Sequence, residues 1–285
     1  MTRNVSDSDS VRRQNRGLVL GALRVQGALS RTALAAATGL SHASITAITQ
    51  NLIEQQIIAE LEAGERPDNR GRGRPATLVG FNRHIGAAAL FEVDVNRSRL
   101  SLVDYGGVLI DRIETPVTPT TFAETPAATF FEQSLRQLQA RNPAEAAALK
   151  RVAISVQGIL DRDGQGLKWS PIAHLANHRF AADLRDGFAV PVTLHKRGRL
   201  LAEGARWLDP ALHEASVATV FLGSTVAMGM TFRGQIMGRS DEGATEFGNM
   251  NHQPDGALCR CGMRGCIEAY AADYGVLRTA YSLPE

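Results

Sequence analysis

The chain has 285 residues, a length that predicts about two domains. Its composition, 44% hydrophobic and 21% charged, is that of a globular protein. No apolar run is long enough for a membrane span or a signal peptide, which excludes membrane and secreted proteins. The cysteines all lie between Cys259 and Cys266 and form no disulfide framework, so we expect a cytoplasmic protein.

The formal net charge of +2 is unevenly divided along the chain. Residues 1–85 hold 11 Arg, no Lys and 7 acidic residues, a balance of +4 that leaves −2 for the remainder. A basic excess confined to the first third of the chain indicates a partner such as nucleic acid for that region.

The first third of the chain predicts three helices. Residues 1–10 are polar and expected to fray, and the apolar spacing over 11–26 predicts an amphipathic helix with an arginine-rich outer face. A second helix is predicted over 31–38, with Ser30 as its N-cap. A third is predicted to follow its N-cap, Ser41, and to run to about Gln56.

The second and third helices have the spacing of a helix-turn-helix. The small residue Ala35 lets the two helices approach, and Gly39 makes the sharp turn between them. The branched apolar residues Ile45 and Ile48 then seat the recognition helix on the core. An ordinary helical hairpin with a glycine turn is the alternative. We expect the exposed face of the third helix to contact base edges in the major groove. The residues assigned to this role are His42, Ser44, Thr46, Thr49 and Gln50.

Two short apolar strands are predicted after these helices, over 57–62 and 76–81, and a loop rich in Gly and Arg joins them. In that loop, Arg70, Arg72 and Arg74 are spaced to follow phosphates or to enter a minor groove. A disordered charged linker is the alternative. Together these features predict a winged helix-turn-helix domain over 12–82 that binds double-stranded DNA.

An α/β domain is predicted from residue 86 to residue 285. Its pattern indicates two similar βββαβ-like halves, of which the second is less regular. The expected strands are 87–95, 100–104, 108–114, 152–156, 190–194, 216–222 and 226–232, and the expected helices are 121–142, 199–207 and 267–279.

The three cysteines, Cys259, Cys261 and Cys266, form the strongest local motif of this domain. Glycines between them allow tight chain reversals, so the thiolates can converge on one tetrahedral metal ion. A structural zinc site needs four ligands, and His252 is the nearest candidate for the fourth, although it can equally be a solvent-facing histidine. Three free thiols are the alternative.

Three segments near the end of the chain resemble the signature of the ROK family of repressors, open reading frames and sugar kinases. They are Thr245 to Gly248, Pro254 to Gly256, and the C-x-C-G-x-x-G-C-x-E pattern that ends at Glu268. Because of its Gly-Arg-Gly-Arg-Pro stretch at 71–75, the first third is similar to the repressor branch. The resemblance runs from about residue 12 to the end of the chain. It implies an actin-like ATPase fold of the sugar-kinase type, a zinc site of one His and three Cys, and homo-oligomers on operators of carbohydrate genes that a sugar regulates.

The chain departs from the kinases of this family at three places. The kinases hold the phosphates of ATP with two glycine-containing loops, because only glycine lets the backbone approach phosphate closely. Residues 94–98 match the first loop, D-x-G-G-T, and have neither of its glycines. Residues 223–229 match the second loop and keep only two of its four glycines. The sugar-binding and catalytic Asn-Asp pair falls on Lys196 and Arg197, and arginine is no general base near neutral pH. We therefore predict a protein that is not an enzyme. A residual sugar kinase with a DNA-binding appendage is the alternative.

Glu246 and Asn249 match sugar-contacting positions of the family, and Asn249 replaces a histidine that also ligates zinc. Lys196, Arg197 and Arg199 put three cations where a neutral-sugar site has Asn and Asp, which favours an anionic sugar such as a sugar acid or sugar phosphate. A decayed pocket with solvated cations is the alternative.

Family repressors continue well past the cysteine motif, so we expect the second domain to be truncated at its C-terminal end and to expose apolar surface. The sequence as a whole predicts a cytoplasmic repressor of carbohydrate catabolism genes that binds operator DNA. A degenerate protein that keeps DNA affinity but senses no ligand is a further alternative.

Overall fold

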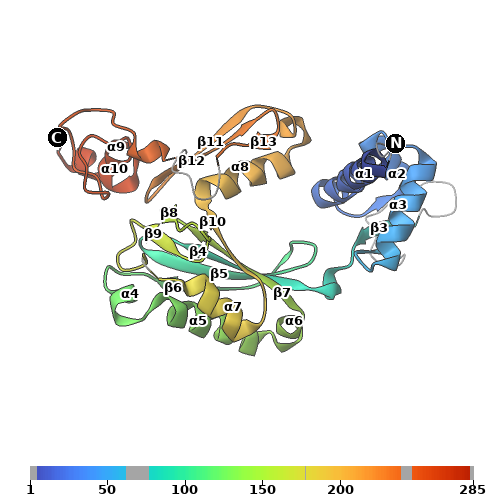
Figure 1. Cartoon of the computed structure of the whole chain (residues 1–285), viewed down its shortest axis with the longest axis horizontal. Coiled ribbons are helices and arrows are strands. Elements are labelled where there is room, and N and C mark those ends of the chain that lie inside the picture. The colour runs from blue at the N-terminus through green and yellow to red at the C-terminus, as the bar shows by residue number, and fades with distance from the viewer. Residues whose placement is uncertain (1–4, 62–76, 177, 239–245, 283–285) are drawn as a thin grey trace. The chain divides into compact units, whose positions relative to one another are not determined.

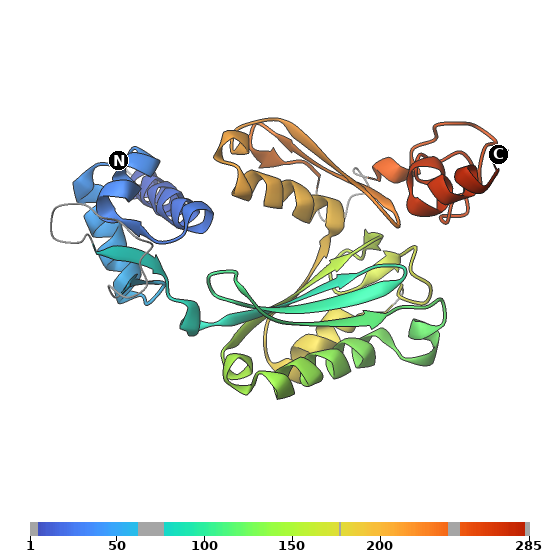
Figure 2. The ribbon, with the colours of Figure 1, turned by 180° about the vertical axis from the view of Figure 1, so that it is seen from behind.

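The computed structural model describes residues 5–61, 77–176, 178–238 and 246–282, and Figures 1 and 2 show it from two sides. The chain divides into two compact units. The first comprises Met1–Gly86 together with the turn Asp104–Val108, and the second comprises Ala87–Val103 and Leu109–Glu285. Within the described ranges, no helix has the length and apolarity to cross a membrane.

Three helices make up most of the first unit: α1 (Val5–Gln26), α2 (Arg31–Thr38) and α3 (His42–Glu54). α1 begins earlier than expected, because Ser and Asp are only moderately poorer helix formers than Ala and a helix already formed extends into them. The predicted caps are confirmed. Ser30 Oγ accepts a hydrogen bond of 3.1 Å from Ala33 N, and Ser41 Oγ accepts one of 3.1 Å from Ser44 N. Gly39, at φ 70°, ends α2 in the left-handed conformation that glycine adopts without strain.

A small antiparallel sheet completes this unit, in the order β1-β3-β2. Its strands are β1 (Leu29–Ser30), β2 (Ile58–Leu61) and β3 (Leu78–Phe81). One apolar core joins the helices to the sheet and contains Val19, Leu23, Leu34, Ile45, Leu52, Ile58 and Val79. The segment between β2 and β3 lies outside the described residues.

The turn Asp104–Val108 belongs to this first unit although its flanking strands do not. Arg83, in the short 3₁₀ helix η2 (Arg83–Ile85), makes an ion pair with Asp104. The ring of Tyr105 lies edge to face against Phe81, with centroids 6.3 Å apart. These two contacts attach the turn to the end of the first unit.

The second unit is built on a five-stranded sheet of order β10-β7-β4-β5-β6. β7 is parallel to both β4 and β10, whereas β5 and β6 are antiparallel. The strands are β4 (Ala87–Val93), β5 (Arg97–Asp104), β6 (Leu109–Pro116), β7 (Leu149–Val156) and β10 (Val192–Lys196). A short hairpin of β8 (Ile159–Leu160) and β9 (Leu167–Trp169) follows β7.

Helices α5 and α7 cover one face of this sheet, as Figures 1 and 2 show. Phe131 of α5 packs on Phe91 of β4 with ring centroids 5.0 Å apart, and Phe180 of α7 lies 5.3 Å from Phe131. The helix expected over 121–142 is broken at Pro126, which supplies no N–H for a continuous helix. The helices here are α4 (Thr121–Glu124), α5 (Ala127–Arg141), α6 (Pro143–Ala147) and α7 (Phe180–Phe188).

The remainder of the second unit contains a three-stranded antiparallel sheet, β11-β12-β13, on which α8 packs. A Cβ on Gly229 of β12 would overlap the carbonyl oxygen of Gly198 in α8, so glycine is needed for this close approach. The elements are α8 (Arg197–Leu208), η3 (Pro210–Leu212), β11 (Val217–Leu222), β12 (Val226–Phe232), β13 (Gln235–Ile236), η4 (Phe247–Asn249), α9 (Glu268–Ala271) and α10 (Asp273–Ser282).

The two expected halves are less alike than the sequence pattern indicated. The strand expected at 190–194 as the start of the second half is β10, which pairs in parallel with β7 and so belongs to the five-stranded sheet. The helix expected over 267–279 is split into α9 and α10, because Ala272 between them has an extended backbone.

Candidate functional site

The exposed polar face of α3 is the first candidate site. The side chains of His42, Thr46 and Gln50 are exposed. Ser44 is half-buried, and its hydroxyl lies 2.9 Å from that of Ser41. The Thr46 hydroxyl donates a hydrogen bond of 2.9 Å to the carbonyl oxygen of His42 in the preceding turn. These four residues can therefore meet a partner that approaches the N-terminal part of α3.

Thr49 was expected on the same face, and this prediction is wrong. Its side chain is 0% exposed, because it lies one turn after Ile45 on the face that packs against the core. The Thr49 hydroxyl donates to the carbonyl oxygen of Ile45 at 2.8 Å and accepts from Nε of Arg31 at 3.2 Å. Arg31 also pairs with Glu60 of β2 at 2.8 Å, so Thr49 helps to fasten α2 and the sheet to α3.

The predicted loop arginines, Arg70, Arg72 and Arg74, lie outside the described residues. The strands on either side of that loop are described, and they pair in antiparallel register with Glu60 opposite Val79 and Leu61 opposite Leu78. A DNA-contacting role for the three arginines stays a prediction.

The second candidate site lies in the second unit, where β4 and β10 end. Arg197, the first residue of α8, donates from Nη1 to Asp94 Oδ2 at 3.0 Å and from Nη2 to the carbonyl oxygen of Val93 at 3.1 Å. Its guanidinium also lies over the ring of Phe221, 4.9 Å from the centroid. Ser224, in the turn between β11 and β12, donates a hydrogen bond to the other carboxylate oxygen of Asp94.

This arrangement keeps Asp94 ionised although the side chains of Arg197 and Asp94 are only 10% and 11% exposed. Burial by itself would raise the pKa of Asp94, but the hydrogen bond from Ser224 and the charge of Arg197 outweigh it and lower the pKa. The ion pair of Asp94 and Arg197 therefore joins the end of β4 to α8 at neutral pH. The hydrogen bond from Ser224 to Asp94 connects both to the second sheet.

The other two cations of this region are also partnered. Lys196 Nζ makes an ion pair with Glu246, and Arg199 donates to the carbonyl oxygen of Gly238 at 3.0 Å. The three cations that favoured an anionic ligand therefore all have partners within the protein and present no unmatched charge to an anion. The alternative of a decayed pocket expected solvated cations, and this part of it is wrong, because Lys196 and Arg197 are buried.

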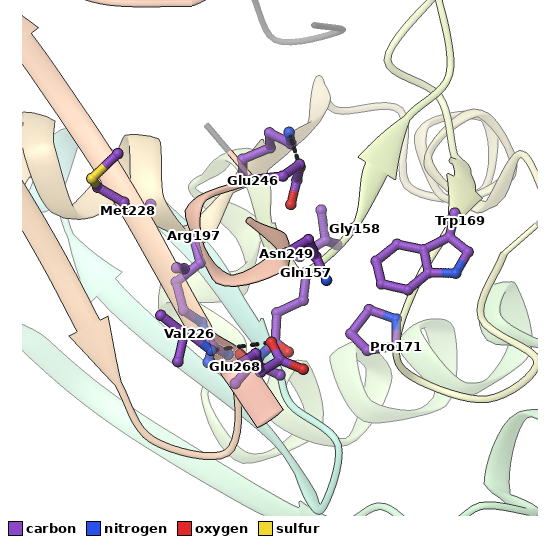
Figure 3. A pocket seen from close by; sticks show the side chains of 15 residues that line it. Gln157, Gly158, Trp169, Pro171, Arg197, Val226, Met228, Glu246, Asn249 and Glu268 are labelled. Atoms are coloured by element: carbon purple, nitrogen blue, oxygen red, sulfur yellow. Dashed lines mark hydrogen bonds and ion pairs between the residues drawn. The ribbon is translucent and has the colours of Figure 1, made fainter. Parts of the chain in front are cut away.

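Beside these ion pairs is a small pocket of about 50 Å³. Figure 3 shows Trp169 and Pro171 on one side of it, Arg197 and Val226 on the other, and Gln157 and Asn249 between them. Glu246 and Asn249, both predicted to contact a ligand, line this pocket together with Lys196 and Arg197.

Two lining residues, Gln157 and Thr225, were missed by the sequence analysis. Neither the amide nitrogen nor the amide oxygen of Gln157 has a hydrogen-bond partner among the described residues, and the same holds for the Thr225 hydroxyl. A buried polar atom without a partner is costly, so these groups indicate a water or a ligand in the pocket. A signal was available for Gln157, which directly follows the buried strand β7 at the edge where parallel strands carry binding residues.

The three cysteines do converge. The sulfur atoms of Cys259, Cys261 and Cys266 all lie within 4.8 Å of one another. Gly262 and Gly265, at φ 89° and 82°, make the reversals that bring them together. Because Cys266 is surrounded by protein and by the two other thiols, its pKa is raised to about 12. Such a group of thiols is suited to hold a metal ion.

His252 does not join this cluster among the described residues, and the alternative of a solvent-facing histidine is confirmed. Its side chain is exposed, and its ring packs edge to face against Tyr270 with centroids 5.6 Å apart. Backbone hydrogen bonds from His252 and Gln253 to the carbonyl oxygen of Gly265 hold this segment in place. Asn249 lies closer to the thiols, with its amide nitrogen 4.0 Å from Cys259 Sγ.

The cysteine segment is attached to the second sheet by Glu268. Its carboxylate accepts a hydrogen bond of 3.2 Å from Val226 N, and its other oxygen lies 3.8 Å from Cys259 Sγ. Burial raises the pKa of Glu268. Glu268 therefore connects Cys259 to Val226, which lines the pocket.

Comparison with known proteins identifies this arrangement. The model of the ROK family matches residues 97–284. The chain belongs to the ROK family. It is 22% identical over 279 residues to a xylose repressor of Bacillus subtilis, with 97% of this chain and 70% of the relative covered. It is 24% identical over 275 residues to the DNA-binding transcriptional repressor Mlc of Escherichia coli, with 95% and 66% covered.

Solved structures of ROK proteins have the same fold. A ROK transcriptional regulator homologous to the E. coli Mlc protein superimposes with a TM-score of 0.65 at 20% identity, over 96% of this chain and 69% of the other. A ROK glucokinase from Streptomyces griseus, solved with glucose and AMPPNP, superimposes with a TM-score of 0.55 at 21% identity, over 68% and 60%. The second unit of this ROK protein therefore has the actin-like sugar-kinase fold.

Proposed function

We propose that this ROK protein is a DNA-binding transcriptional repressor of sugar-metabolism genes, and that its kinase-like unit is a sensor rather than an enzyme. The observation that carries the proposal is the exposed polar face of α3, with His42, Thr46 and Gln50, on a helical unit joined to a ROK domain. The similarity to the xylose repressor and to Mlc supports it.

The first unit would act as a winged helix-turn-helix. α3 would enter the major groove, where His42, Ser44, Thr46 and Gln50 contact base edges. Arg70, Arg72 and Arg74 would contact phosphates or the minor groove from the loop between β2 and β3. Two copies of this unit in a homo-oligomer would bind two half-sites of an operator.

Kinase activity is not part of this proposal. The position of the family's catalytic Asp is taken by Arg197, whose guanidinium is engaged with Asp94 and Val93 and cannot accept a proton near neutral pH. Asp94 itself is engaged by Arg197 and Ser224. Gly229, one of the two glycines left in the second phosphate loop, is required for packing against α8. No observation favours the alternative of a residual sugar kinase.

The ligand of the sensor would be a neutral sugar or another polyhydroxylated compound. Each cation of the pocket is matched by a carboxylate, whereas the amide of Gln157 and the hydroxyl of Thr225 are unpartnered groups that suit ligand hydroxyls. The pocket, at about 50 Å³, is far below the several hundred Å³ of usual ligand pockets. A sugar would therefore enter only when the pocket widens, and binding would favour the wider arrangement.

A structural zinc ion would hold the cysteine segment. The separation of 3.6 Å between the sulfurs of Cys261 and Cys266 fits the spacing of about 3.8 Å that Zn–S bonds of about 2.3 Å give in a tetrahedron. Cys259, Cys261 and Cys266 would supply three ligands, and a water the fourth. Bound zinc would fix the loop that carries Glu268 against the pocket, and metal analysis of the purified protein under reducing conditions tests its presence.

Selection of bound duplexes from a random pool tests the DNA-binding proposal. The wild-type chain is expected to enrich one motif, and Thr46→Ala and Gln50→Ala are expected to bind the enriched duplex at least about tenfold more weakly, because a good base contact contributes about 1–3 kcal/mol. Gln137→Ala, an exposed change on α5, is the matched control and should bind as wild type does. If the wild-type chain enriches no motif, the proposal is wrong.

A further inference from the structure

The helices α1 and α3 share a hollow that the sequence analysis did not anticipate. It has a volume of about 690 Å³ and lies wholly within the first unit. From α1 it is lined by Arg12, Arg13 and Arg16, and from α3 by Ser44, Ala47 and Asn51. The arginine-rich face of α1 that the sequence predicted therefore lies beside the proposed recognition helix, with Arg12 and Arg13 exposed and Arg16 half-buried.

The position of these arginines on α1 is unusual for a packed helix. Val19 and Leu23 are core residues, with side chains 0% and 2% exposed. Arg12 and Arg16 lie seven residues before them, which is two helical turns, so all four residues share one face of α1. Two apolar residues of the same segment, Val11 and Leu18, are 48% and 39% exposed instead. The face turned toward α3 thus changes from apolar to basic within two turns, which packing alone does not explain.

Two of the arginines that line this hollow, Arg12 and Arg16, have no counterpart among the described residues. None of its lining residues is Asp or Glu, and neither Arg12 nor Arg16 forms an ion pair or hydrogen bond with any residue that the structure describes. This differs from Lys196, Arg197 and Arg199, which are all partnered. Guanidinium groups without internal partners beside an exposed polar helix face are suited to an external polyanion.

We propose that Arg12 and Arg16 of α1 form a second DNA contact, in which they bind backbone phosphates of the strand that borders the major groove occupied by α3. The two residues are one helical turn apart, about 6 Å along the axis, and so can reach neighbouring phosphates of one strand. This inference rests on the proposed DNA binding. It adds a contact that supplies affinity and orientation but carries no base preference.

The salt dependence of binding tests this contact. Log affinity falls linearly with log salt concentration, and each neutralised phosphate makes this slope steeper by about 0.9. The probes are a mixed-sequence duplex of about 30 base pairs and the duplex enriched by the wild-type chain, titrated from about 50 to about 200 mM salt. Arg12→Gln with Arg16→Gln is expected to reduce the slope by about 1.8 on both probes and to weaken binding about tenfold or more at the lowest salt. The enriched motif should not change.

Arg16→Gln alone is expected to reduce the slope by about 0.9, and Arg24→Gln is its matched control, since each removes one charge from α1. Arg24 lies at the other end of the helix, 5.6 Å over the ring of Phe81, and its removal should leave the slope as in wild type. Circular dichroism checks that all variants are folded. The inference is overturned if the folded double variant keeps the wild-type slope, or if its enriched motif changes. If the wild-type chain binds neither duplex, the proposed function fails as well, so the two failures are distinguishable.

Discussion

The hollow between α1 and α3 and the pocket beside β10 both contain adjacent basic side chains, but in different surroundings. In the pocket, Lys196 faces Glu246 and Arg197 faces Asp94, and both cations are buried. In the hollow, no carboxylate lies among the described residues that line it beside Arg12 and Arg16. A buried cation needs a partner from its own chain, whereas an unmatched basic surface attracts a partner from outside. Similar residue types therefore stabilise the fold in one region and offer a binding surface in the other.

The largest effect is expected at Arg197. Replacement by Met leaves the carboxylate of Asp94 buried without its cation, which should lower the free energy of unfolding by about 3–5 kcal/mol. Urea titration measures this. The double variant Arg197→Met with Asp94→Asn should recover a large part of the loss, because it removes the unmatched charge. Equal stability of wild type and Arg197→Met would mean that the ion pair does not hold this region.

The pH dependence of the same pair should have a definite sign. Because the pKa of folded Asp94 lies below the ordinary aspartate value of 3.8, its ionised form stabilises the fold fully above about pH 5, and this contribution is lost as the pH falls through 3.8 and below. The difference in free energy of unfolding between wild type and Asp94→Asn should therefore shrink from about pH 6 to about pH 3. A difference that stays constant over this range would contradict the assignment.

Gly229 tests whether the remaining glycines of the second phosphate loop serve packing. Gly229→Ala puts a methyl group against the carbonyl oxygen of Gly198 and should cost about 1–3 kcal/mol of stability. Gly204→Ala, at a helical position in α8 with open space around it, should be neutral or slightly stabilising. Thermal unfolding of the two variants side by side makes the comparison, and similar melting temperatures would refute the packing role.

The smallest effect is expected at Thr49, which separates buried from exposed polar residues on α3. Thr49→Val keeps the shape of the side chain and removes its hydrogen bonds to Ile45 and Arg31, which should lower stability by about 1 kcal/mol. The DNA motif selected by this variant should be that of wild type. A changed motif would place Thr49 at the DNA after all.

Several features could be predicted from the sequence because their causes are local. Ser30, Gly39 and Ser41 mark the ends of α2 and α3, since caps act within one helical turn. The cysteines converge as predicted, since only short loops with glycines separate them. The ROK signature was also visible in a short stretch of residues, and the family match confirms it.

The tertiary structure alone decided which charges are matched. Arg197 meets Asp94 across 103 positions of sequence and Lys196 meets Glu246 across 50, and no local pattern specifies such pairs. Tertiary packing also decided that β10 joins the five-stranded sheet. It likewise decided the surroundings of Thr49 and Arg16, which depend on where α1 and α3 pack. Residue type and spacing determine the local elements, because their energetics act over a few residues. Burial and pairing depend on distant segments, and at these positions they determined which cations stabilise the protein and which are exposed to a partner.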